Sequence, residues 1–96
     1  LPTVPVVAPK VAELAASDDA YFQANGLILR NPTLINFLDG CALSLPCHRP
    51  GDAPVGLMLA APGGRDADVL SAGAAIEAVL MTEAPSFSSA CPYLRP

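Results

Sequence analysis

Two cysteines and the single histidine are the residues of this chain best suited to chemistry. Cys41, Cys47 and His48 are soft metal ligands that lie close together in the sequence. Their spacing matches neither a C-x-x-C pair nor a zinc finger, and a four-ligand zinc site would also need Cys91. Adjacent residues of an extended strand point to opposite faces, so a Cys47 thiolate would not meet His48 as its base. We interpret Cys41 and Cys47 as buried, inert thiols and His48 as a solvated loop residue, and expect no metal or cofactor.

A second candidate site lies where a loop meets a helix. Pro62-Gly63-Gly64-Arg65 faintly resembles a phosphate-binding turn, but it lacks the Lys-Ser/Thr ending of a P-loop and the three glycines of a dinucleotide site. Asp66 and Asp68 would repel phosphate, and acids at a helix start are favoured by the helix dipole. We therefore interpret residues 62–65 as an ordinary loop. With Lys10 as its only lysine and no G-x-S-x-G serine, the chain holds no complete catalytic apparatus.

The composition excludes several classes of protein. The chain has 96 residues, of which 52% are hydrophobic and 15% charged, and its net charge is −4. An acidic chain lacks the positive surface that nonspecific binding to nucleic acid or to an anionic membrane requires. A chain of this length forms at most one domain, and so small a domain leaves much of its surface exposed. With few charges to cover that surface, we expect either an oligomer or a piece of something larger.

The sequence also indicates a compartment. No stretch approaches the roughly 18 apolar residues of a membrane span. Residues 1–9 lack the basic start and long apolar core of a secretory signal. The three cysteines form no even framework, which favours reduced thiols. We predict a soluble, cytoplasmic protein without nucleic-acid or membrane partners.

Turn and capping signals divide the first half of the chain. The prolines of residues 1–10 suit an extended segment or an edge strand, and residues 10–16 form a short turn or helical piece. Ser17 followed by two acids predicts a helix start, with Tyr21, Ala24, Leu27 and Ile28 on one apolar face. This helix should end before Pro32. Residues 33–38 are too few to classify by period, and a turn closes them at residues 39–40.

Two apolar runs and a long helix follow. Residues 41–47 and 55–61 read as strands, and the second has no polar alternation, which is typical of a strand buried on both faces. Asp66 is a good N-cap for a helix to about Thr82. One stripe of that helix carries Val69, Gly73, Ile76 and Leu80, with Ala72, Ala75 and Val79 beside it. The fold class is α/β or α+β.

Three blocks of the chain resemble the C-terminal stretch of the amidase signature family. They are Pro2–Pro9, Arg30–Cys47 and Ala53–Leu59, and they stand in the family's order and spacing. The wording of residues 36–42, Asn-Phe-Leu-Asp-Gly-Cys-Ala, is most similar to bacterial amidases of the carboxybiuret or allophanate hydrolase sort. The resemblance implies an α/β/α fold around a large mixed sheet. This chain would be its C-terminal slab, with a few strands and two main helices in residues 1–82 and a Pro/Ser-rich tail in residues 83–96.

The same resemblance implies which residues act. The family hydrolyses carboxamides with a triad of Ser, cis-Ser and Lys, none of which is matched here, and Lys10 does not stand at the triad position. We therefore assign no catalytic residue. Four positions match the segment beside the family's substrate pocket, although Pro32 replaces a Thr of the motif and a cysteine stands where Pro is common. These substrate-binding candidates are Arg30, Asn31, Asn36 and Cys41.

Simpler roles remain open for these candidates and for the chain. Asn36 could hydrogen-bond a turn, and Arg30 could cap the end of its own helix. We predict the C-terminal fragment of an amidase, inactive alone, which depends on the rest of the amidase chain and serves a small amide substrate. The alternative is a stand-alone structural or interaction module that forms a homo-oligomer through unpaired sheet edges and an apolar helix face.

Overall fold

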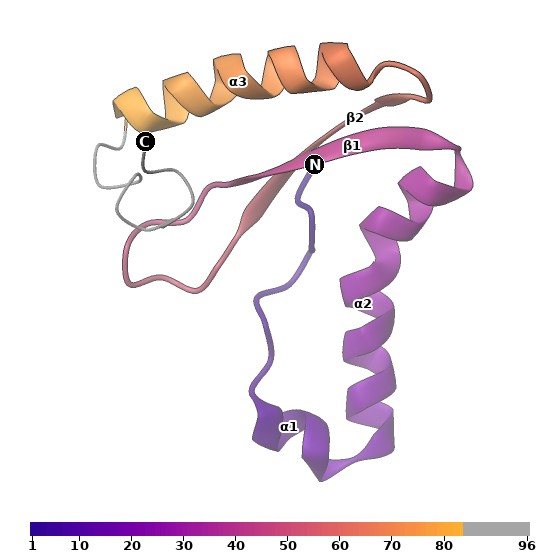
Figure 1. Ribbon diagram of the computed structural model, residues 1–96. Coiled ribbons are helices and arrows are strands. Elements are labelled where there is room, and N and C mark those ends of the chain that lie inside the picture. The colour runs from indigo at the N-terminus through magenta and orange to yellow at the C-terminus, as the bar shows by residue number, and fades with distance from the viewer. Residues whose placement is uncertain (84–96) are drawn as a thin grey trace.

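A computed structural model describes residues 1–83 of the chain (Figure 1). The predicted tail therefore lies almost wholly outside the described residues. The elements follow in the order α1 (Val11–Ala16), α2 (Asp18–Phe37), β1 (Gly40–Pro46), β2 (Gly56–Pro62) and α3 (Asp66–Glu83). This is a mixed α/β arrangement, as the sequence predicts.

The two strands form an antiparallel hairpin. Their register pairs Gly40 with Pro62 and Pro46 with Gly56. The start of the chain adds to the outer edge of β2 through an antiparallel bridge between Pro2 and Leu57. The Thr3 amide donates to the Gly56 carbonyl at 2.9 Å. The beginning of residues 1–10 thus meets the sheet edge through an isolated bridge and does not form a strand of the sheet.

Helix α2 begins as predicted and ends later than predicted. The Ser17 hydroxyl accepts a hydrogen bond from the Ala20 amide at 3.1 Å, which caps the helix. The prediction that the helix stops before Pro32 is wrong, because α2 continues through this proline to Phe37. A proline removes one helical hydrogen bond. Here tertiary contacts flank it on both sides, at the buried Asn31 and at Ile35, whose side chain lies against Gly40.

A tight turn connects α2 to β1. Asp39 adopts a positive φ of 56°, and its amide donates to the Asn36 carbonyl at 3.1 Å. A Cβ on Gly63 would lie only 2.5 Å from the Asp39 carbonyl oxygen. The turn lies at residues 38–39, so the prediction of residues 39–40 is confirmed at Asp39, while Gly40 already begins β1. Gly63 allows the next loop to approach this turn.

Helix α3 lies directly on the hairpin. A Cβ on Gly73 would lie 2.3 Å from Leu43 Cδ2, and Val69 is buried. The predicted stripe is confirmed: Ile76 and Leu80 are half-buried on the same side, and the residues predicted beside the stripe are exposed. Asp66 is the first residue of the helix rather than its N-cap, which shifts the predicted start by one position.

The two faces of the hairpin meet different helices. Residues alternate between faces along a strand, so Leu43 and Leu59 face α3 while Gly40 meets Ile35 of α2 from the other side. Figure 1 shows α3 along one side of the hairpin and α2 leaving it on the other. The expectation that β2 is buried on both faces is wrong for this chain, because Met58 alone on it is buried and Ala60 is exposed.

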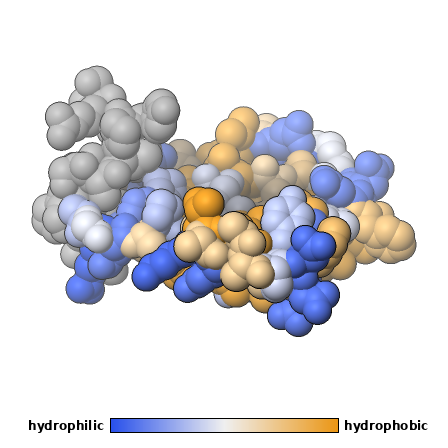
Figure 2. Space-filling model, turned by 90° about the horizontal axis from the view of Figure 1, so that it is seen from below, coloured by the Kyte–Doolittle hydropathy of each residue, from blue (hydrophilic) through white to orange (hydrophobic). Residues whose placement is uncertain are grey.

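The core is small for so apolar a chain. Among the described residues, the buried apolar side chains are Leu45, Met58 and Val69. Phe37 is 85% exposed and Phe22 is 67% exposed. Figure 2 shows hydrophobic residues at the surface beside hydrophilic ones. In residues 1–83, no helix has both the length and the apolar character needed to cross a membrane.

Candidate functional site

The structure joins two of the predicted site residues, Arg30 and Asn31. The Arg30 Nε donates to Asn31 Oδ1 at 3.2 Å. The Asn31 side-chain amide in turn donates to the Pro2 carbonyl oxygen at 2.7 Å. Asn31 is only 6% exposed, whereas Arg30 is exposed. Two hydrogen bonds in series therefore connect the surface of α2 to the segment at the start of the chain.

The other two candidates occupy different surroundings. The Asn36 side chain is exposed, and its backbone carbonyl accepts the Asp39 amide of the turn. The Cys41 thiol donates to the Pro62 carbonyl at 3.4 Å and lines a cavity of about 220 Å³ beside Val69 of α3. Within the described residues, hydrogen bonds between side chains connect only Arg30 and Asn31 among the four candidates.

The structure bears on the simpler roles suggested for Arg30 and Asn36. Arg30 does not cap the end of its helix, because α2 continues past it. The backbone carbonyl of Asn36 accepts a hydrogen bond in the turn, and the suggestion that its side chain serves the turn stays a prediction.

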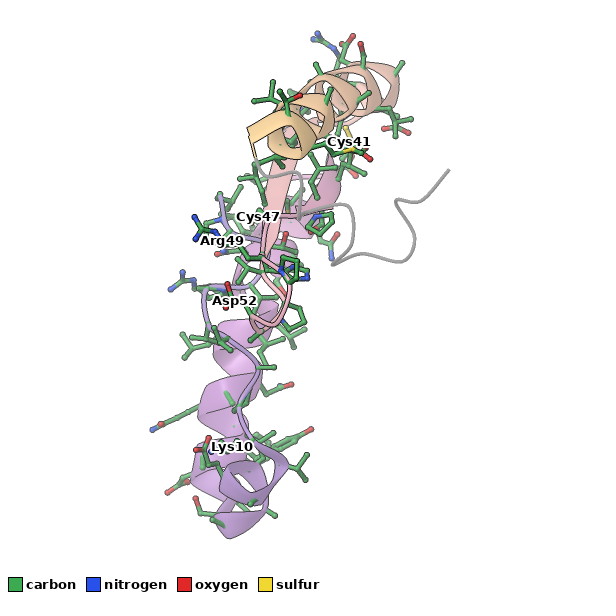
Figure 3. The ribbon with its side chains drawn as sticks, turned by 90° about the vertical axis from the view of Figure 1, so that its left-hand side faces the viewer. Lys10, Cys41, Cys47, Arg49 and Asp52 are labelled. Carbon is green, nitrogen blue, oxygen red and sulfur yellow. The ribbon has the colours of Figure 1, made fainter. Side chains whose placement is uncertain are left out.

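The cysteines and the histidine do not form a cluster. Cys41 and Cys47 are half-buried and free, so the prediction that they are buried is wrong in that respect. Cys41 lies near the start of β1 and Cys47 just past its end, and Figure 3 shows the two apart. The His48 ring nitrogen Nδ1 lies 3.4 Å from both the amide nitrogen and the carbonyl oxygen of Val55. His48 is half-buried rather than fully solvated, so its prediction as a solvated residue is wrong in that respect. No three His, Cys, Asp or Glu side chains of residues 1–83 are placed to share a metal ion.

The loop before α3 behaves as an ordinary turn. The Arg65 amide donates to the Pro62 carbonyl at 3.3 Å, and Gly64 has a positive φ of 87°. The Arg65 guanidinium pairs with the Asp68 carboxylate, and both side chains are 62% exposed. The arginine of this loop is therefore already paired with an acid.

Lys10 lies at the start of α1, at the end of the molecule opposite Cys41 (Figure 3).

Sequence reasoning missed a groove beside residues 2–7. It measures about 550 Å³, is walled mostly by prolines and valines, and includes His48. The hydroxyls of Thr3 and Ser44 meet at 2.5 Å in it, and either can be the donor. A Cβ on Gly56 would lie 2.6 Å from Ser44 Oγ and 2.8 Å from Thr3 Oγ1, so the two hydroxyls meet over a strand residue without a side chain. The only signal in the sequence is a glycine inside a strand pattern.

Comparison with known proteins gives one informative similarity. No family model and no solved structure matches the chain. Over 80 residues the chain is 32% identical to 2-amino-5-chloromuconic acid deaminase from Comamonas testosteroni. The similarity covers 82% of this chain and 17% of the deaminase. The chain is thus distantly related to a hydrolytic enzyme, and it spans about a sixth of the length of that relative.

Proposed function

We propose that this chain is the C-terminal segment of an amidase signature hydrolase that cleaves a C–N bond and releases ammonia. The observation that carries the proposal is the 32% identity over 80 residues to a deaminase several times longer. A hydrolase of this kind attacks the bond with a serine nucleophile and stabilises the resulting oxyanion. The segment lacks that machinery, so we propose that it is inactive alone and that other segments of the polypeptide supply the triad.

The arrangement of the three amidase-like blocks supports this proposal. The first block reaches β2 through Pro2, the second contains the end of α2 and all of β1, and the third contains the start of β2. Three blocks that are separated along the chain therefore meet in one layer. Apolar segments that resembled the family by chance would not need to lie together in the fold. Segments of a scaffold shared with the family would.

The proposed role of the segment is to shape the scaffold and one wall of the substrate pocket. We retain the four candidates named above as residues of this pocket wall, and propose a different role for each. Arg30 is exposed and can contact a substrate, whereas Asn31 is buried and positions its neighbours. Asn36 and the Cys41 thiol occupy the two sides of the turn into β1.

Exposed apolar side chains favour a second candidate function, a module that associates with a copy of itself. Phe37 and Leu38 are 85% and 64% exposed at the end of α2. β1 has β2 on one edge and no strand of the described residues on the other. An open edge without charged residues can accept another strand.

Assays of ammonia release separate the two functions. An antibody against residues 1–83 would be used to purify every polypeptide that contains them from the producing cells. We expect the 96-residue chain to release no ammonia from carboxamides or amino acids of the muconic type, and a larger polypeptide to release it. Ammonia release by the isolated chain would contradict its proposed inactivity. Inactivity of every purified polypeptide on the whole panel would contradict the amidase assignment and favour the module.

A further inference from the structure

The guanidinium of Arg30 is held at one end and open at the other. Its Nε donates to Asn31 Oδ1, and no other hydrogen bond or ion pair engages the group within residues 1–83. Arg65 provides the contrast, because its guanidinium already pairs with Asp68. The two terminal nitrogens of Arg30 are therefore available to a ligand at the exposed surface of α2.

Asn31 fixes the direction in which this guanidinium points. Its Oδ1 accepts from Arg30 while its amide nitrogen donates to the Pro2 carbonyl. A flipped amide would place NH2 against the Nε–H donor and an oxygen against a carbonyl oxygen, and would lose both bonds. Because Asn31 is 6% exposed, little of its side chain is open to water that could replace those bonds. Side chains at adjacent positions of a helix do not normally face each other, so this contact is a specific feature of the site.

The acids of α2 lie far from Arg30. Arg30 is the only basic residue of α2, and the helix's acids are Asp18 and Asp19 in the first turn. At 1.5 Å rise per residue, Asp19 is roughly 16 Å away along the axis, which is about twice the Debye length at physiological salt. The acids of the helix therefore neutralise little of the Arg30 charge.

We propose that Arg30 is a carboxylate-binding residue that selects an unsaturated dicarboxylic acid as the substrate, with Asn31 as its positioning residue. This inference rests on the proposed function. A guanidinium with its Nε occupied still offers two terminal N–H groups in a planar fork, which match a carboxylate with two parallel hydrogen bonds. The related deaminase is named for 2-amino-5-chloromuconic acid. Muconic acid is a six-carbon dienedioic acid, so such a substrate carries a carboxylate at each end.

A binding experiment on the whole 96-residue chain tests this inference without any activity assay. The ¹⁵N-labelled protein would be titrated with cis,cis-muconate and, separately, with the neutral diamide of the same acid. We expect saturable shifts of the Arg30 Nε–H resonance and of the backbone amide of residue 30 with muconate, and none with the diamide. The backbone amide also reports on binding in variants that lack the Nε–H group. Arg30→Lys keeps the charge but loses the fork, and should weaken binding about tenfold, the effect of losing one hydrogen bond to a charged group.

Two further variants separate positioning from simple charge. Arg49→Gln removes a positive charge from an exposed loop residue and should leave muconate binding unchanged. Asn31→Ala keeps every charge and should weaken binding severalfold, with an unchanged amide spectrum elsewhere as evidence of folding. If Asn31→Ala unfolds the chain, Asn31→Ser replaces it in the same muconate titration, because serine keeps a polar group at this position.

The outcomes are distinct. A saturable shift of the residue 30 amide whose affinity falls in Arg30→Lys and stays the same in Arg49→Gln supports the inference. No saturable shift at Arg30, or equal losses in the two arginine variants, would overturn it. Failure of the proposed function would instead appear in the ammonia assays, because the binding titration does not depend on catalysis.

Discussion

The side-chain amide of Asn31 donates a 2.7 Å hydrogen bond to the Pro2 carbonyl oxygen, and so ties α2 to a segment that lies 29 residues earlier. Asn31 is 6% exposed, whereas Pro2 is an exposed residue, so the bond is shielded from water on the α2 side only. Replacing the amide leaves the carbonyl without its partner. The tie thus holds the first amidase-like block in place.

Asn31→Ala should therefore lower the free energy of unfolding by about 0.5–1.5 kcal/mol, the net contribution of a typical hydrogen bond. Urea denaturation followed by circular dichroism measures this change. Asn25→Ala is the matched control, because Asn25 is exposed on the same helix, where substitutions usually stay within about 0.5 kcal/mol. Equal stabilities of the two variants would show that the tie to Pro2 contributes nothing.

Gly56 lies beneath the contact between the Thr3 and Ser44 hydroxyls. An added Cβ would lie 2.6 Å from Ser44 Oγ, so Gly56→Ala should destabilise the chain by about 1–3 kcal/mol through overpacking. In a Ser44→Ala background this cost should shrink without vanishing, because Thr3 Oγ1 remains 2.8 Å from the added Cβ. A double-mutant cycle with urea denaturation measures the coupling. Strictly additive effects would contradict the predicted contact.

Two helical glycines should respond differently to the same substitution. Gly26 has no atom within 4 Å of an added Cβ, so Gly26→Ala should stabilise the chain by about 0.5–1 kcal/mol through helix propensity. A Cβ on Gly73 would lie 2.3 Å from Leu43 Cδ2, so Gly73→Ala should be at least about 1 kcal/mol less favourable than Gly26→Ala. Thermal unfolding of the two variants tests the close packing of α3 on the hairpin. Equal gains would contradict that packing.

Exposed apolar residues at the end of α2 should make the isolated chain associate. Phe37 is 85% exposed, and burying such side chains in a partner removes apolar surface from water. We predict a dimer or higher oligomer by sedimentation velocity at micromolar concentration. Phe37→Asp should shift the chain toward monomer, whereas Asn25→Asp, which adds the same charge to the same helix, should not. A wild-type chain that sediments as a monomer would contradict this prediction.

Local signals predicted much of the fold. Ser17 followed by acids located the start of α2, and the spacing from Val69 to Leu80 located the face of α3 that lies on the hairpin. The end of α2 was not predictable in this way. A rule about Pro32 considers only neighbouring residues, whereas the contacts that carry the helix past it involve Pro2 and Gly40, which are distant in sequence.

In the candidate site, too, local signals were predictable and contacts between distant residues were not. The resemblance placed Arg30 and Asn31 in one motif, but their different duties depend on burial, which follows from the approach of Pro2. The contact of Thr3 with Ser44 depends on the register that brings both beside Gly56. Single-residue propensities carry no information about such a register.

The size of the polypeptide that contains this sequence in its producing cells tests the central proposal most directly. Intact mass spectrometry after capture with an antibody against residues 1–83 gives this size. We predict a species several times heavier than 9.8 kDa, because the related deaminase is matched over only 17% of its length. A single species of 9.8 kDa would contradict the amidase assignment for this chain and leave the self-associating module as its function.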